Sequence, residues 1–325
     1  MNANAKQEFV ILRIVKRGLV ICVLLAAVVA ASSFTETTPT KESLGRMLFF
    51  DPILSEDSSI RCASCHKPEF AFADNVQFSA GVRGRLATRN TPSAMNVASR
   101  EALFWDGRAT TLEEQALGPI ENPMEMNLPV AEAVKRLNNS ARYRRLFKTV
   151  FKQQPNKENL AAAIAAFERT LETANTPNDR WLNDEPGGLT AQQERGRDIF
   201  RTKAKCFDCH FSPDFTIDEF RSIGLFNGND LNDSGRYHVT KNPADIGKVK
   251  VPGLRNVAVT APYMHNGQFK TLREVIDYYD DPNKFQPNAI NRDSILSQPL
   301  GLTENEKVDL EAFLYSLTDD QFTKK

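Results

Sequence analysis

The stretch CASCH, Cys62–His66, decides how this chain folds, and it recurs once as CFDCH, Cys206–His210. In a Cys-x-x-Cys-His motif, the two thiols can form thioethers with the vinyl groups of a haem, and the adjacent imidazole can bind the iron. The two copies use four of the five cysteines, and the fifth, Cys22, lies in an N-terminal apolar run. The sequence therefore predicts two covalently bound haem c groups, with His66 and His210 as proximal ligands.

Two other uses of these cysteines fit less well. A structural zinc site would favour two CxxC pairs or additional histidines, and a redox-active dithiol would need a single CxxC beside a strand–helix unit. The chain has only four histidines, and two of them belong to the motifs. No cysteine outside the apolar run is left for a disulfide. The haem interpretation is favoured over both alternatives.

The length and the charge of the chain limit the number of domains and the kinds of partner. With 325 residues, the chain can form two ordinary domains, each with its own core. Lys and Arg total 41, as do Asp and Glu, so no excess of positive charge indicates nucleic acid as a partner.

The N-terminus has the layout of a secretory signal peptide. Basic residues, the last of them Lys16 and Arg17, precede the apolar run Gly18–Ala31, which is followed by small and polar residues. The run is short for a membrane span, although an uncleaved inner-membrane anchor remains the alternative. We predict a signal peptide over residues 1–31 and a periplasmic mature protein.

The surroundings of the two motifs repeat in the same order. Four pairs of segments match: LGRMLFF from Leu44 with RGRDIF from Arg195, RNTP from Arg89 with RNVA from Arg255, DGRATTLEEQ from Asp106 with NGQFKTLREV from Asn266, and IAAFERTLET from Ile164 with LEAFLYSLTD from Leu310. Such self-similarity indicates an internal duplication. We predict two tandem cytochrome c-type domains, residues 32–180 and 181–325.

The local patterns predict an all-α fold. Thr190-x-x-Gln193 and Thr303-x-x-Glu306 are capping boxes, and the first is expected to begin a helix that runs into CFDCH. Apolar residues from Leu310 to Leu317 keep the spacing of one helical face, whereas alternating strand-like runs are scarce. The Pro- and Gly-containing stretches 175–181 and 184–190 predict the domain boundary.

The ligand on the other side of each iron is the next question. The two remaining histidines, His238 and His265, both lie in the second half, so the first half has no histidine for its haem. Methionine is the alternative there, and Met95, Met124 and Met126 keep it open.

The repeat offers a second argument. When Gly107 is aligned with Gly267, Tyr279 falls opposite Pro119. Tyrosine is a known haem ligand, whereas proline has no side-chain lone pair to offer. We therefore predict a ligand over the second haem and none over the first.

Several longer motifs resemble a known family. LFFDPILS, CASCH, RNTPS, FWDGRATTLEEQALGPIENPMEM, GRYHVT, KVPGLRN and TAPYMHNG are similar, in this order, to motifs of the bacterial dihaem cytochrome c peroxidase and MauG family. The resemblance covers nearly the whole mature chain. It implies that Gln115 and Glu125 are the distal pair over the peroxide-binding haem and that Trp105 lies between the haems.

The same resemblance implies a calcium ion near the domain interface. Asn90, Thr260 and Pro262 match residues that hold it in the family. Ca²⁺ prefers oxygen ligands, which an Asn side chain and two backbone carbonyls supply together with water.

Two positions resemble the MauG branch more than the typical peroxidases. The latter carry a ligating histidine sixteen residues beyond the first proximal histidine, where this chain has Val82. They also cap the second haem with a methionine fourteen residues after the histidine of TAPYMHNG, where this chain has Tyr279. The resemblance therefore implies a first haem that is open and a second haem with a tyrosine ligand.

The expected activity follows the family. We expect a peroxidase that reduces hydrogen peroxide with electrons from a small cytochrome c or cupredoxin. A MauG-like oxidase acting on a partner protein remains an alternative, although the relay tryptophan expected two residues before the second CxxCH is Ala204 and the remaining Trp181 has no assignable role. A non-catalytic dihaem electron carrier is the third hypothesis. Dimers occur in the family, so a homodimer stays open.

Overall fold

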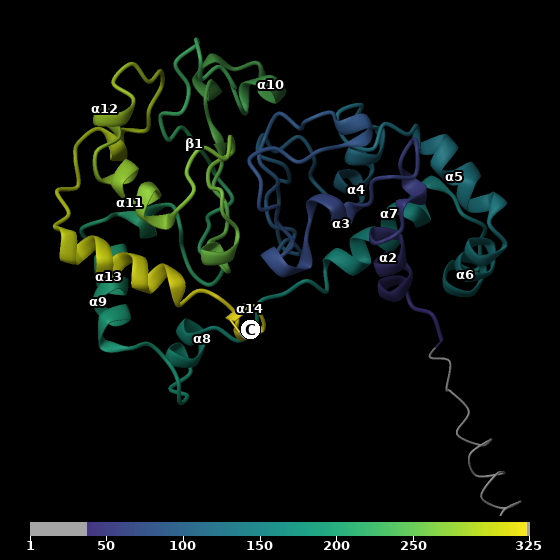
Figure 1. The fold of residues 1–325 in the computed structure, drawn as a ribbon, viewed down its shortest axis with the longest axis horizontal. Coiled ribbons are helices and arrows are strands. Elements are labelled where there is room, and N and C mark those ends of the chain that lie inside the picture. Colours follow the sequence, from purple (N-terminus) through teal and green to yellow (C-terminus); the bar gives the residue numbers. More distant parts are fainter. Residues whose placement is uncertain (1–37, 324–325) are drawn as a thin grey trace, which may run out of the picture. The chain divides into compact units, whose positions relative to one another are not determined.

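Helices dominate the computed structural model of the chain, which describes residues 38–323 (Figure 1). The predicted signal peptide therefore lies outside the described residues. The helices are α2 (Lys41–Phe49), α3 (Cys62–Cys65), α4 (Leu112–Glu121), α5 (Val130–Asn139), α6 (Ala141–Phe151), α7 (Lys157–Glu168), α8 (Pro177–Leu182), α9 (Ala191–Arg201), α10 (Tyr237–Thr240), α11 (Leu272–Asp280), α12 (Pro282–Phe285), α13 (Glu304–Tyr315) and α14 (Asp320–Thr323). The prediction of a helix-rich fold is confirmed.

Strand structure is confined, within residues 38–323, to one small sheet and a few isolated bridges. Strands β1 (Phe220–Arg221) and β2 (Val249–Lys250) pair antiparallel, with Phe220 opposite Lys250. In this same part of the chain, no helix has the length and apolar character needed to cross a membrane.

The first half is organised by the crossing of α2 and α7, which lie side by side in Figure 1. Gly45 of α2 permits this contact, because a Cβ atom there would lie 1.8 Å from the carbonyl oxygen of Ala163 in α7. Leu44, Leu48 and Phe49 of α2 then join the buried apolar core. The Gly-Arg motif before the first haem motif thus marks a helix-crossing point.

The second half repeats this arrangement with α9 and α13. A Cβ atom on Gly196 would lie 1.9 Å from the carbonyl oxygen of Asp309, and Phe200 packs edge-to-face on Phe313 at 5.2 Å between ring centroids. The predicted capping boxes at Thr190 and Thr303 are confirmed at the starts of α9 and α13.

The stretch 175–181, predicted to mark the domain boundary, contains the start of α8, because Thr176 caps the helix and a proline is tolerated in the first turn. One local prediction was wrong. The helix predicted to run into CFDCH ends at Arg201, and Lys205, at φ 52°, precedes a short 3₁₀ turn at Cys206–Asp208.

Specific polar contacts join the two halves, both of which belong to one unit, Pro39–Lys325. The backbone N–H of Lys250 donates to the Trp105 carbonyl at 2.8 Å, and the Arg89 guanidinium donates to both carboxylate oxygens of Asp233 at 2.7 and 2.8 Å. The guanidinium of Arg236 donates to the carbonyl of Asp106 at 2.8 Å. These contacts hold β2 and residues 233–236, which precede it in the chain, against the first half. The boundary at residue 180 stays a prediction.

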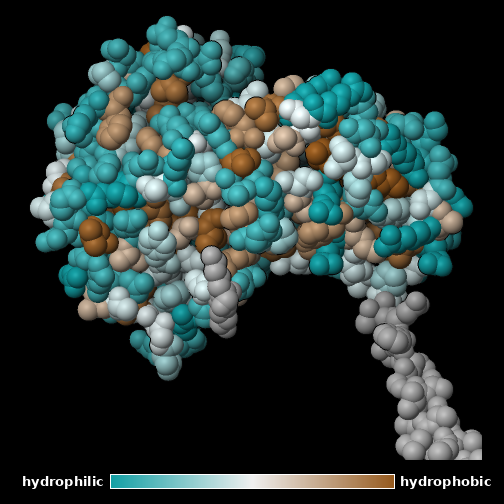
Figure 2. All heavy atoms as spheres, viewed as in Figure 1, coloured by the Kyte–Doolittle hydropathy of each residue, from teal (hydrophilic) through white to brown (hydrophobic). Residues whose placement is uncertain are grey.

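The exterior is predominantly polar. The face in Figure 2 is mostly hydrophilic, and its hydrophobic residues lie in small separate groups. Most large apolar side chains are instead buried in the helix cores.

Candidate haem sites and their cavities

The first motif opens onto a cavity of about 770 Å³. Cys62, Cys65 and His66 line it on one side, and Gln115 of α4 and Glu125 of the following loop also line it. The volume falls in the range of pockets for cofactors and other small ligands. The structure therefore brings together the first haem motif and the predicted distal pair.

The His66 ring is held in one tautomer. Its Nδ1 lies 2.9 Å from the carbonyl oxygen of Phe72. Because a carbonyl only accepts, Nδ1 carries the hydrogen, and burial, which lowers the pKa of His66, keeps the ring neutral. The lone pair is then on Nε2, the arrangement that suits an imidazole ligand of a metal.

The second motif is built in the same way around a smaller cavity of about 220 Å³. Cys206, Cys209 and His210 line it, and His210 Nδ1 lies 2.9 Å from the carbonyl oxygen of Phe215. Burial lowers the pKa of His210 as well. In both halves, two thiols and a neutral, oriented imidazole line one cavity, and this donor set fits a covalently attached haem.

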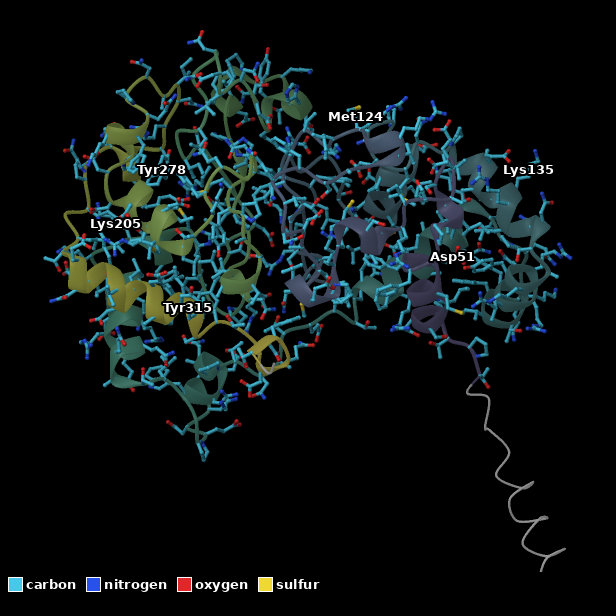
Figure 3. All side chains as sticks on the ribbon, in the orientation of Figure 1. Asp51, Met124, Lys135, Lys205, Tyr278 and Tyr315 are labelled. Atoms are coloured by element: carbon cyan, nitrogen blue, oxygen red, sulfur yellow. The ribbon has the colours of Figure 1, made fainter. Side chains whose placement is uncertain are left out.

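The ligand positions predicted from the repeat face their cavities. Pro119 in α4 lines the first cavity, and Tyr279 in α11 lines the second. Burial raises the pKa of Tyr279, so that its phenolate needs a cation beside it to form. Its neighbour Tyr278, labelled in Figure 3, instead donates a hydrogen bond to the Ile223 carbonyl. Of this pair, only Tyr279 lines the second cavity.

Val82 does not contribute a side chain to the first cavity. It is fully buried, and its backbone N–H donates to the Glu125 carbonyl at 2.8 Å. Gly81 allows this close approach, because a Cβ there would lie 2.2 Å from the carbonyl oxygen of Met124. The segment that carries a ligand in the typical peroxidases is thus used here to support the Glu125 backbone.

Glu125 has the environment of a proton-transferring group. Asn122 donates a hydrogen bond from Nδ2 to Glu125 Oε1 at 2.6 Å. Burial raises the pKa of Glu125, and the hydrogen bond from Asn122 opposes that rise. A carboxyl group with a raised pKa exchanges protons more readily near neutral pH.

Trp105 lines both cavities. Its indole Nε1 donates to the Asn90 carbonyl at 2.8 Å, and its ring meets that of His265 edge-on at 6.4 Å between centroids. The side chain is therefore anchored where the two cavities meet, and its place between two haems stays a prediction.

The methionine alternative also has structural candidates. Met95, Met124 and Met126 all line the first cavity. The sulfur of Met95 accepts a hydrogen bond from Asn256 at 3.6 Å, and Met124, labelled in Figure 3, is partly exposed. Replacement of each methionine by leucine distinguishes methionine ligation from an open iron.

Comparisons with known proteins agree with this geometry. The family model described as di-haem cytochrome c peroxidase matches residues 39–187. The methylamine utilization protein MauG of Methylorubrum extorquens is 38% identical over 282 residues, covering 86% of this chain and 78% of that protein. The chain belongs to the di-haem cytochrome c peroxidase and MauG family. Membership implies two haem c groups and makes the protein an oxidoreductase.

Further relatives carry both names of the family. The cytochrome c peroxidase Ccp of Escherichia coli is 41% identical over 242 residues, covering 73% of this chain and 52% of that protein. A crystal structure of a MauG-like protein associated with microbial copper homeostasis has 35% identity and a TM-score of 0.78, covering 89% of this chain and 93% of that one. The comparisons therefore establish the family without separating its two activities.

The residues that resemble the family's calcium ligands come together. Asn90, Thr260 and Pro262 all line the second cavity. The Asn90 Nδ2 donates to the carbonyls of Val76 and Gln77 at 3.1 and 3.2 Å. Among the described residues, no hydrogen bond reaches Asn90 Oδ1, and the calcium site stays a prediction.

The two other histidines occupy different environments. His265 is buried beside the second cavity, and its pKa is lowered to about 4 by burial. His238 is exposed at the rim of the first cavity, with Nε2 3.1 Å from the Ser234 hydroxyl. His238 thus lines the first cavity although it belongs to the second half, and His265 lines the second cavity together with Tyr279. Ligation of the second haem by Tyr279 stays a prediction.

Sequence reasoning missed three residues that line the first cavity. Asn122, in the quoted ENPMEM motif, orients Glu125. Lys250 lines both cavities, and burial lowers its pKa to about 8; among the described residues it has no ion-pair partner and could pair with a haem carboxylate. Glu168 is a buried acid in the first cavity. The sequence contained one signal for Glu168, because the internal repeat aligns this acidic residue with the apolar Leu314.

Proposed function

We propose that this protein is a peroxidase that reduces hydrogen peroxide to water at a constitutively open haem held by His66. One observation carries the proposal: the first cavity contains the carboxyl group of Glu125, whereas no Asp or Glu of the described residues lines the second. Cleavage of a peroxide requires proton transfer, and a positioned carboxyl group can supply it. Among the described residues, a carboxyl group for proton transfer is thus available in the first cavity and not in the second.

The proposed reaction consumes one hydrogen peroxide, two electrons and two protons and yields two waters. The haem iron, when bound, supplies the site at which the O–O bond is broken. Glu125 accepts a proton from the inner peroxide oxygen and returns it to the outer one, and Asn122 holds the carboxyl group in place. Gln115 orients the peroxide by hydrogen bonding. Such general acid–base assistance is typically worth about 100- to 10,000-fold in rate.

The second haem site is proposed to serve in electron transfer. Tyr279 and His210 would together hold the iron of the second haem and close it to peroxide, and Trp105 would connect the two sites. A small cytochrome c or cupredoxin in the periplasm is the proposed electron donor. We further propose one Ca²⁺ at Asn90, Thr260 and Pro262, and two cytochrome c domains divided near residue 180.

Electron paramagnetic resonance of the ferric protein as isolated tests the proposal. We expect a high-spin signal from the first haem without prior reduction, and loss of that signal when cyanide binds. In steady-state assays, peroxide should be consumed with two equivalents of a reduced small cytochrome. A purely low-spin spectrum without cyanide binding would instead support a dihaem electron carrier.

Modification of a partner protein is the second candidate, favoured by Tyr279 and by the MauG relatives. Against it, Ala204 is buried at the position expected for the relay tryptophan. Trp181 lines neither cavity, and its indole nitrogen donates to Glu194 at 2.9 Å. Rapid turnover with small reduced donors distinguishes the peroxidase from such an oxidase.

A further inference from the structure

Glu168 is an acidic side chain buried in the first cavity without a partner. It is the last residue of α7, is 7% exposed, and lines the cavity together with Ile164, one turn earlier. Its Oε2 atom has no hydrogen-bond partner among the described residues. A buried carboxylate without a partner is costly, so the group is expected to be protonated or to interact with something that enters the cavity.

The internal duplication shows that the fold does not require an acid here. Gly45 contacts Ala163 in the first half as Gly196 contacts Asp309 in the second, which sets the register between α7 and α13. In this register, Glu168 corresponds to Leu314. Leu314 is also buried and lines the second cavity. The same position is therefore apolar in one half and ionisable in the other.

The charges around Glu168 leave its carboxyl group without a counter-ion. Arg169, next to it on α7, makes two hydrogen bonds of 2.7 and 2.9 Å to Glu113 on α4. Burial raises the pKa of Glu168 to about 8. The charge of Arg169 lowers this pKa and the charge of Glu113 raises it, so that the two effects oppose each other.

The other elements around α7 add little charge. On α3, the Cys62 thiol faces Glu168, and burial together with Glu168 raises its pKa. The faces that α2 and α5 bury are apolar. The cavity itself is also lined by charged side chains, among them Arg100, Arg108 and Glu125. Because Glu168 is buried, an added charge in the cavity would act on it more strongly than it would in water.

We propose that Glu168 binds one proton when the haem of the first cavity accepts one electron, and releases it when the iron is oxidised. The inference rests on the proposed function only in placing a haem in this cavity. In each cycle, one electron from a one-electron donor reduces the iron, and one proton from solvent converts the Glu168 carboxylate to the acid. The net charge of the cavity is unchanged, which favours the coupled step over electron transfer alone in a low-dielectric site. Peroxide reduction consumes protons and electrons in equal number, and Glu168 holds one such proton in the cavity where they are used.

Potentiometric titration of both haems between pH 6 and 10 tests the coupling. In the wild-type holoprotein, the reduction potential of the first haem should fall with pH by up to about 59 mV per unit, the value for a tenfold change in a one-electron equilibrium. Glu168→Gln, which keeps the shape, and Glu168→Leu, which copies the second half, should both abolish this slope. The second haem should be unaffected in all proteins.

Glu113→Gln is the matched control. It leaves Glu168 in place but frees Arg169, so that the slope should persist and move to lower pH. An unchanged slope in Glu168→Gln would overturn the inference. If the variants do not fold, proton uptake is measured while the wild-type protein is reduced in unbuffered solution. The absence of proton uptake between pH 7 and 9 would contradict the proposal.

Peroxide turnover measured on the same samples separates this inference from the proposed function. A pH-dependent potential that requires Glu168, in a protein that does not reduce peroxide, would support the inference and contradict the peroxidase. Peroxide turnover in a protein whose first haem has a pH-independent reduction potential would support the peroxidase and contradict the inference.

Discussion

Pro119 and Tyr279 occupy the same position relative to the N-caps of their helices, Thr111 and Thr271, and each lines the cavity of its own half. A duplicated backbone thus presents a side chain without a lone pair to one cavity and a phenol to the other. This difference supports an open first haem and a closed second haem.

Replacement of Tyr279 by Phe should change the second haem alone. Loss of the phenol oxygen removes the proposed iron ligand, so its low-spin signal should shift or convert to high spin in electron paramagnetic resonance. Tyr278→Phe is the control, because Tyr278 hydrogen-bonds to Ile223. That variant should lose about 1 kcal/mol of stability and keep the wild-type spectrum. A wild-type spectrum in Tyr279→Phe would contradict tyrosine ligation.

Asn122→Ala should move the acid limb of the pH–rate profile to higher pH. The hydrogen bond from Asn122 favours the Glu125 carboxylate, and its loss raises the pKa of Glu125 further. A rate that depends on the carboxylate then declines at a higher pH as the solution is acidified. Glu125→Gln should lower peroxide turnover by about 100- to 10,000-fold without changing the ferric spectrum. Identical profiles in wild type and Asn122→Ala would remove Glu125 from the proton-transfer step.

Single replacements of Met95, Met124 and Met126 by Leu should leave the high-spin signal of the first haem unchanged. Leucine keeps the approximate volume and removes the sulfur, so any methionine ligation would be lost. Conversion of a low-spin first haem to high spin by one of these variants would identify a methionine ligand and contradict the open site.

Gly45→Ala and Gly196→Ala should strongly destabilise the protein. Each added Cβ would lie within 2 Å of a carbonyl oxygen on the crossing helix, at Ala163 or Asp309. Overpacking of this kind costs about 1–3 kcal/mol or more, measurable by denaturant unfolding. Gly118→Ala in α4 is the control, since its Cβ would meet only the Phe104 ring at 3.1 Å. Similar losses in all three variants would show that helix crossing is not the cause.

Glu168→Gln should stabilise the protein increasingly as the pH rises. The pKa of Glu168 is raised from an ordinary 4.5 to about 8 by burial, so that the folded protein holds this proton more tightly than the unfolded chain. The contribution is fully present below pH 4.5 and is lost as the pH rises to about 8. The variant should gain up to roughly 5 kcal/mol relative to wild type over that interval, measured by urea unfolding at several pH values. A constant difference would show that Glu168 does not titrate between these limits.

Much of the haem chemistry could be predicted because it depends on local spacing. CxxCH places two thiols and an imidazole within one turn, and the repeat aligned Tyr279 with Pro119 without any coordinates. The Gly-Arg motifs were recognised as repeat anchors, although their reason, a helix crossing without room for a Cβ at Gly45 and Gly196, required the structure. The start of α8 within 175–181 was not predicted, because proline in the first turn suits a helix start as well as a loop.

The sequence was thus sufficient for the two CxxCH motifs, the helical class and the alignment of Pro119 with Tyr279, because these depend on residue type and on short or repeated spacing. Three-dimensional packing was needed to bring Trp105 to both cavities, to set Asn122 against Glu125 and to bury Glu168 without a partner. Those properties arise from contacts between segments far apart in the chain, or from the exclusion of water by surrounding helices. Charge, pKa and access to peroxide all depend on that exclusion, which no single segment encodes.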